Sequence, residues 1–105
     1  MQELFMAKKV DGVIEAVHYQ DGQIANVRAY ERRDATFSDH ILIDRKDLIE
    51  RIKKGKKFLV GTRKELMAST FNLGKPVQVL TRNGKEIIST SAEADHDELE
   101  NVWVF

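Results

Sequence analysis

Residues 10–33 read VDGVIEAVHYQDGQIANVRAYERR, two strand-like runs that flank the dipeptide Asp21-Gly22. This dipeptide suits a two-residue type I′ turn, because both of its central positions require a positive φ. Apolar and polar residues alternate along both runs, as they do in half-buried strands. The stretch therefore predicts a β-hairpin, and its turn sets the register of the two strands.

The predicted register brings opposite charges face to face. Glu15 falls opposite Arg28, and Asp11 falls opposite Arg32. Each directly opposed pair is worth roughly 0.2–1 kcal/mol. A slip of one residue would separate both pairs, so we expect this register to hold with Glu15 opposite Arg28.

A second hairpin is predicted near the other end of the chain. Residues 77–90 read VQVLTRNGKEIIST, in which Asn83-Gly84 is again a type I′ dipeptide between two strand-like runs. The turn places Leu80 opposite Ile87, with apolar residues on both faces.

One helix is predicted between the hairpins, over residues 45–54. Asp44 can cap its start, and Gly55 can end it in the left-handed conformation. Leu48 and Ile52 fall on one stripe of this helix. We therefore expect both side chains to face the core.

The chain end is also predicted to join the fold. Residues 102–105 read VWVF and are apolar enough to dock as a last strand. Because a terminal strand with apolar neighbours gains little by staying in water, we expect Trp103 to be substantially buried.

These patterns together predict a small α+β protein. We expect a curved antiparallel sheet or a partly open small β-barrel built from hairpins, with one α-helix at about residues 45–54. With 105 residues, the chain has the size of one domain covering residues 1–105. No run of 18 apolar residues occurs, so no membrane span is expected.

The composition excludes several classes of chemistry. There are no cysteines, so the chain has no disulfides, thiolate metal sites or cysteine nucleophiles. This composition suits the reducing cytoplasm, where we expect the protein to reside. Hydrophobic residues make up 42% of the chain and charged residues 32%, an ordinary balance for a folded protein.

Three short motifs carry residue types used in catalysis or ligand binding. The Ser-Asp-His run at 38–40 cannot be a triad, because adjacent residues of an extended chain point to opposite sides. The Gly-Thr-Arg-Lys run at 61–64 lacks the second glycine of a phosphate-binding loop and reads better as a strand end. The Asp-His-Asp-Glu run at 95–98 matches no calcium loop and reads better as a solvated acidic loop than as a metal site. We therefore expect no enzyme activity, no cofactor and no metal site.

The distribution of charge is the main functional signal. Residues 51–64 contain seven basic side chains and no acidic one, whereas residues 93–100 contain five acidic side chains and no Lys or Arg. Basic side chains near aromatic rings are typical of sites that bind single-stranded nucleic acid. The candidate residues for binding nucleic acid or another polyanion are Arg32, Arg33, Phe37, Lys53, Lys56, Lys57, Arg63 and Lys64.

Two functional hypotheses follow. The leading one is a small non-enzymatic binding module that engages nucleic acid or an acidic protein surface through its basic patch. The alternative is a structural or self-associating protein without a nucleic-acid ligand, a homo-oligomer held by its apolar chain ends or by its complementary charges. A near-neutral net charge favours the alternative, since dedicated nucleic-acid binders are usually strongly basic.

Overall fold

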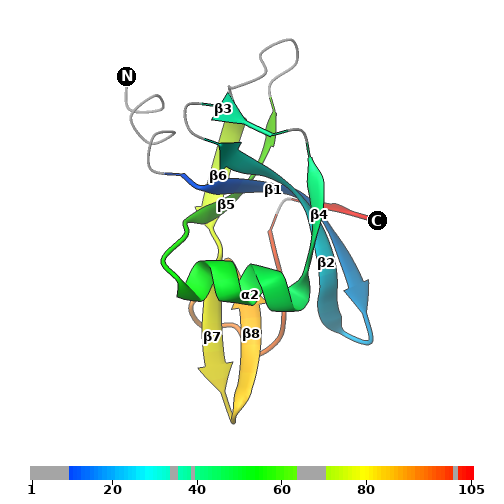
Figure 1. Cartoon of the computed structure of the whole chain (residues 1–105). Helices are drawn as coiled ribbons and strands as arrows, with labels where there is room; N and C mark the ends of the chain where they lie inside the picture. Colours follow the sequence, from blue (N-terminus) through cyan, green and yellow to red (C-terminus); the bar gives the residue numbers. More distant parts are fainter. Residues whose placement is uncertain (1–9, 34–35, 39, 64–70, 101) are drawn as a thin grey trace.

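A computed structural model of the chain describes residues 10–33, 36–38, 40–63, 71–100 and 102–105. Strands hold most of these residues, and one helix lies across the end of a separate hairpin (Figure 1). The elements are β1 Gly12–Gln20, β2 Gln23–Arg33, β3 Thr36–Phe37, β4 Ile41–Asp44, α2 Arg45–Lys53, β5 Phe58–Arg63, β6 Phe71–Pro76, β7 Gln78–Arg82, β8 Lys85–Ser89 and β9 Trp103–Val104.

Seven strands form one mixed sheet, and β7 and β8 form a second sheet of two strands. The main path is β3-β2-β1-β5-β6, with β4 also paired to β2 and β9 to β1. The sheet curves but does not close into a barrel (Figure 1). The predicted α+β class with one helix is confirmed. The parallel pairing of β1 with β5 and β9 is not predicted from the sequence, because hairpin turn residues indicate only how strands adjacent in sequence pair.

Both hairpins turn where the sequence predicts. The backbone φ angles of Asp21 and Gly22 are 54° and 78°, and those of Asn83 and Gly84 are 53° and 78°. All four are positive, as a type I′ turn requires. The β7–β8 hairpin also keeps its predicted register along its whole length.

The first hairpin departs from its predicted register in the middle. A β-bulge in each strand shifts the pairing by one residue, so that Arg28 lies opposite Ala16 and Glu15 is the extra residue of β1. The predicted pairing of Glu15 with Arg28 is therefore wrong. The bulge lets both Ile14 and Val17 face the main core, where both are fully buried. Burying one such side chain is worth about 1.5–3 kcal/mol, which exceeds the roughly 0.2–1 kcal/mol of a cross-strand charge pair.

The helix forms as predicted. The Asp44 side chain accepts a hydrogen bond from the backbone N–H of Asp47 at 2.8 Å, and Gly55 beyond the helix end has a φ of +95°. Leu48 is fully buried, while Ile52 is partly buried against the same core. The helix of the described residues has nine residues, far fewer than the roughly 20 that cross a bilayer.

The main sheet carries apolar side chains on both faces. The larger cluster joins the sheet to α2, to the β7–β8 hairpin and to the chain before β9, and includes Ile14, Val17, Val27, Leu48, Ile88 and Leu99. The smaller cluster lies on the other face at the far end of the sheet, and consists of Val10, Val13, Tyr30 and Leu59 with Phe37, Phe71 and Leu73 packed against them.

Trp103 does not join either cluster. It pairs with Ala16 at the edge of β1, and 73% of its surface is exposed. The expectation that Trp103 is buried is therefore wrong. The core positions of this segment are taken by Leu99, which is buried, and by Val102, which packs against the main cluster.

Candidate functional site

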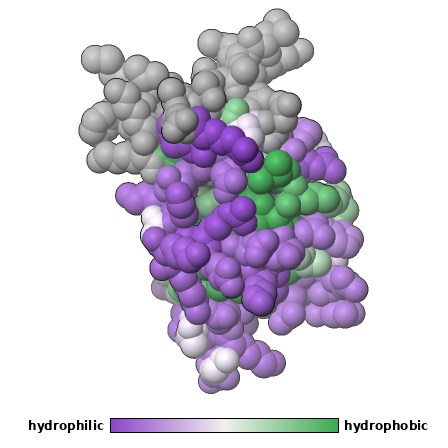
Figure 2. All heavy atoms as spheres, viewed as in Figure 1, coloured by the Kyte–Doolittle hydropathy of each residue, from purple (hydrophilic) through white to green (hydrophobic). Residues whose placement is uncertain are grey.

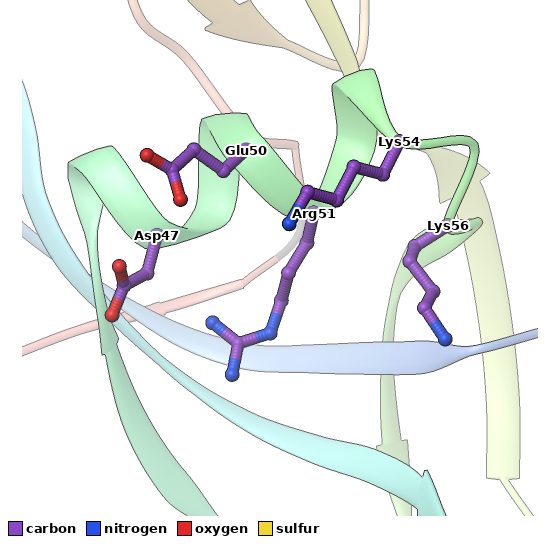
Figure 3. Close-up of a pocket in the computed structure, with 5 residues that line it drawn as sticks. All are labelled: Asp47, Glu50, Arg51, Lys54 and Lys56. Carbon is purple, nitrogen blue, oxygen red and sulfur yellow. The ribbon is translucent and has the colours of Figure 1, made fainter.

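A groove of about 360 Å³ lies along α2, from its first turn to the loop that follows the helix. We call it the α2 groove, and its lining residues are Asp47, Glu50, Arg51, Lys54 and Lys56. In Figure 3, Asp47, Arg51 and Lys56 point to the same side of the helix, Lys56 from the loop that follows it. The helical spacing of three and four residues brings the first four side chains together, and the tight turn at Gly55 returns the chain beside them.

The α2 groove is lined by three basic and two acidic side chains, and one of the basic ones is already paired with the sheet. The Arg51 guanidinium donates to the carboxylate of Glu31 on β2, with Nε and Oε2 2.8 Å apart. Lys54 and Lys56 are exposed, and in Figure 3 the Lys54 side chain runs back along the helix toward Arg51. The groove therefore presents two ammonium groups to a partner, beside the carboxylates of Asp47 and Glu50.

Hydrogen bonds to Asp11 connect the groove region to two further residues that the sequence predicts to bind a polyanion, Lys57 and Arg32. The backbone N–H of Lys57 donates to the Asp11 carboxylate at 2.8 Å. The backbone N–H of Arg32 donates to the Asp11 carbonyl oxygen, also at 2.8 Å. The Arg32 Nε donates to the carbonyl of Val10 at 2.6 Å. Lys56, Lys57 and Arg32 therefore lie on segments that meet at Asp11.

The aromatic rings near these cations are engaged inside the fold. Phe37 is half-buried and lies edge-on to Phe71, with ring centroids 4.8 Å apart. The Arg32 guanidinium lies over the Phe37 ring, 4.9 Å from its centroid. Tyr30 is buried, and its hydroxyl donates to the Glu15 carboxylate at 2.8 Å. Neither ring projects as a free platform on which a base would stack.

The structure does not place the remaining residues of the predicted binding set at the α2 groove. The Lys53 ammonium forms an ion pair with Glu86 on β8, away from the groove. Arg33 is exposed at the end of β2. Arg63 ends β5, but its side chain lies outside the described part of the structure, and so does the whole of Lys64. Arg51 and Lys54 line the groove although neither is among the binding residues predicted from the sequence.

The acidic segment, residues 93–100, contains one buried carboxylate. Asp97 accepts hydrogen bonds from the backbone N–H groups of Ile24, at 2.8 Å, and Ile88, at 3.0 Å, and pairs with the Arg45 guanidinium. Arg45 also donates to the carbonyl of Glu86 at 2.6 Å. The interpretation of residues 95–98 as a solvated acidic loop is therefore wrong at Asp97, which joins β2, β8 and the start of α2.

A second hollow, of about 450 Å³, lies between the two hairpin turns and the acidic segment. It is lined by side chains of both signs, among them Asp21, Arg82, Lys85, Asp95 and His96. Within the described residues, no group of three or more His, Cys, Asp or Glu side chains is arranged to hold a metal ion.

His96 is expected to titrate above the ordinary histidine range. Its Nδ1 lies 2.7 Å from Oδ1 of Asp95, and this hydrogen bond raises the pKa of His96 and lowers the pKa of Asp95. The ion pair therefore stabilises the folded protein only at pH values between those two pKa values. It is lost when pH rises through the raised pKa of His96 or falls through the lowered pKa of Asp95. An NMR titration should give His96 a midpoint above 6.5 in the wild type and a lower one in Asp95→Asn. Glu98→Gln should lower the His96 midpoint less than Asp95→Asn does. Equal midpoints in the wild type and the two variants would contradict the pairing of His96 with Asp95.

A third surface is apolar. We call it the apolar sheet end, and its exposed residues are Leu42, Trp103, Val104 and Phe105. The strand registers place Leu42, Arg28, Ala16 and Trp103 in one row across β4, β2, β1 and β9, so these residues share a face of the sheet. Figure 2 shows the corresponding hydrophobic area beside β4 and the C-terminal end. Exposed apolar patches of this kind are typical of interaction sites.

No known protein family, curated protein or solved structure matches this chain. The geometry of its three surfaces is therefore the basis for assigning a function.

Proposed function

We propose that this chain is a non-enzymatic binding module that engages an acidic partner at the α2 groove. The observation that carries this proposal is that two exposed lysines, Lys54 and Lys56, line one groove. Lys57 lies in the loop next to the groove, and Arg32 lies on the strand that meets this loop at Asp11. Within the described residues, the ion pairs of the acidic segment go to Arg45, Lys75 and His96, and none of them engages a groove lysine.

The chemistry of the surroundings favours an acidic protein surface over single-stranded nucleic acid. Binding of single strands draws much of its energy from bases stacked on aromatic rings, about 1–3 kcal/mol per base. Phe37 and Tyr30 are both packed within the fold, so neither of these rings provides such a platform in the described part of the chain. Cations without stacking rings suit a partner recognised by charge and hydrogen bonding.

The test is a binding titration with two probes, poly-L-glutamate and a random single-stranded oligonucleotide, at several salt concentrations. Poly-L-glutamate should bind with an affinity that falls as salt rises, because the contacts are exposed ion pairs. The oligonucleotide should bind no more tightly. Salt-dependent binding of the oligonucleotide alone would establish the nucleic-acid alternative, and binding of neither probe would contradict the proposal.

Reversing two groove charges should remove most of this binding. We expect Lys54→Glu with Lys56→Glu to weaken poly-L-glutamate binding at least about tenfold, because both cations become repulsive at the contact. The matched control, Lys46→Glu with Lys85→Glu, changes net charge equally at exposed positions outside the groove. Equal losses in the two variants would show that binding follows net charge, contrary to a groove site. Circular dichroism checks that both variants stay folded.

A further inference from the structure

The strand β9 leaves one residue with an open backbone edge. The backbone N–H of Phe105 donates to the carbonyl of Val17 on β1 at 2.9 Å. Backbone N–H and C=O groups of successive strand residues point to alternate sides, so both groups of Val104 point away from β1. Within the described residues, no strand pairs with this outer edge.

The end of the chain is anchored at this edge. The Arg28 guanidinium lies 4.8 Å from the centroid of the Phe105 ring, and His18 contacts the same residue through its own ring and through the Phe105 carbonyl oxygen. Trp103 and Phe105 lie on the same face of the strand, because side chains alternate along it. The open edge is therefore presented in a defined position and is flanked by two exposed aromatic rings.

We propose that two copies of this chain associate edge to edge through β9, antiparallel about a twofold axis at Val104. In an antiparallel pair, two directly opposed residues can exchange both of their N–H···O bonds. The two open groups of Val104 meet that requirement with Val104 of the partner subunit. Trp103 then lies opposite Phe105 of the partner subunit, so that each copy covers the other's exposed ring. This proposal does not depend on the α2 groove.

The net charge permits a second copy as the occupant, and the exposed area indicates how strongly that copy binds. A net charge of zero means that two copies do not repel each other at long range. From their exposed fractions, Trp103, Val104 and Phe105 together offer on the order of 350 Å² per copy. This is less than the roughly 800 Å² per partner of a standard stable interface, so the dimer should be weak and should form only on concentrating.

The only tryptophan of the chain reports on this interface directly. We expect Trp103 emission to be water-like in dilute solution and to shift to the blue on concentrating, in parallel with a rise in mass from monomer to dimer by sedimentation. A water-like emission and a monomer mass at every concentration would overturn the proposal and would leave the edge open to an unrelated chain. A blue-shifted emission in dilute solution would overturn it as well.

Two variants test the edge geometry. Val104→Pro removes the outward N–H while the bonds to β1 use Trp103 and Phe105, and should weaken association at least about tenfold. Trp103→Ser should weaken association to a similar extent, as measured by sedimentation. Both variants should unfold at the same temperature as the wild type.

The matched control is Leu42→Ser, an exposed apolar residue on the same face but three strands away. It should leave association unchanged. Loss of association in Leu42→Ser, or its retention in Val104→Pro, would indicate that two sheet faces stack instead and would overturn edge pairing.

Discussion

Replacing Asp97 with alanine is expected to lower the free energy of unfolding by about 3–5 kcal/mol, the usual cost of breaking a buried charge pair from one side. The Asp97 side chain is only 2% exposed and accepts from two backbone N–H groups as well as from Arg45. Its removal leaves the N–H groups of Ile24 and Ile88 buried without an acceptor, and each such group costs about 1–3 kcal/mol. The variant therefore loosens three elements at once.

Urea unfolding measures this loss. The matched control is Asp95→Ala in the same segment, where the side chain is 89% exposed; this change should stay within about 0.5 kcal/mol. A double-mutant cycle with Arg45→Ala should give a coupling of about 0.5–3 kcal/mol, because the two side chains contact each other. Equal losses in the Asp95 and Asp97 variants would refute the structural role of Asp97.

Local signals in the sequence predict most of the secondary structure. The Asp-Gly and Asn-Gly turns require positive φ angles that few residues tolerate, and the cap at Asp44 satisfies free helix amides. These requirements act within a few residues, so they can be recognised without knowing the rest of the fold. The turns and the helix ends accordingly lie where the pattern places them.

Predictions from the sequence are missing or wrong for features that depend on distant parts of the chain. The register in the middle of the first hairpin is decided by whether Val17 reaches the core, and that choice outweighs the charge pair at Glu15. The position of Trp103 depends on Leu99 having already filled the core. The role of Asp97 requires groups that lie 73, 52 and 9 residues away in sequence.

The candidate site was partly predictable for the same reason. The basic run at residues 51–64 is visible in the sequence, and helical spacing alone places Arg51 and Lys54 on one side of α2. The pairing of Arg51 with Glu31 could not be inferred, because it joins α2 to β2 across the sheet. The same holds for the packing of Phe37 against Phe71, which withdraws a ring that the sequence offers for stacking.

Leu48→Ala is expected to cost about 2–5 kcal/mol, the range for truncating a fully buried leucine. Leu48 has no exposed surface and belongs to the main core, where α2 meets β2, β4 and β7. A helix of nine residues is too short to be stable alone, so this packing is what holds α2 against the sheet.

The size of the loss in Leu48→Ala is judged against two other positions of α2. Ile52→Ala should cost less, because Ile52 is only partly buried, and Lys46→Ala should stay within about 0.5 kcal/mol, because Lys46 is exposed. Thermal or urea unfolding of the three variants measures this order. If Leu48→Ala cost no more than Lys46→Ala, the apolar stripe of α2 would not face the core. The α2 groove, which depends on the position of this helix, would then have no fixed geometry.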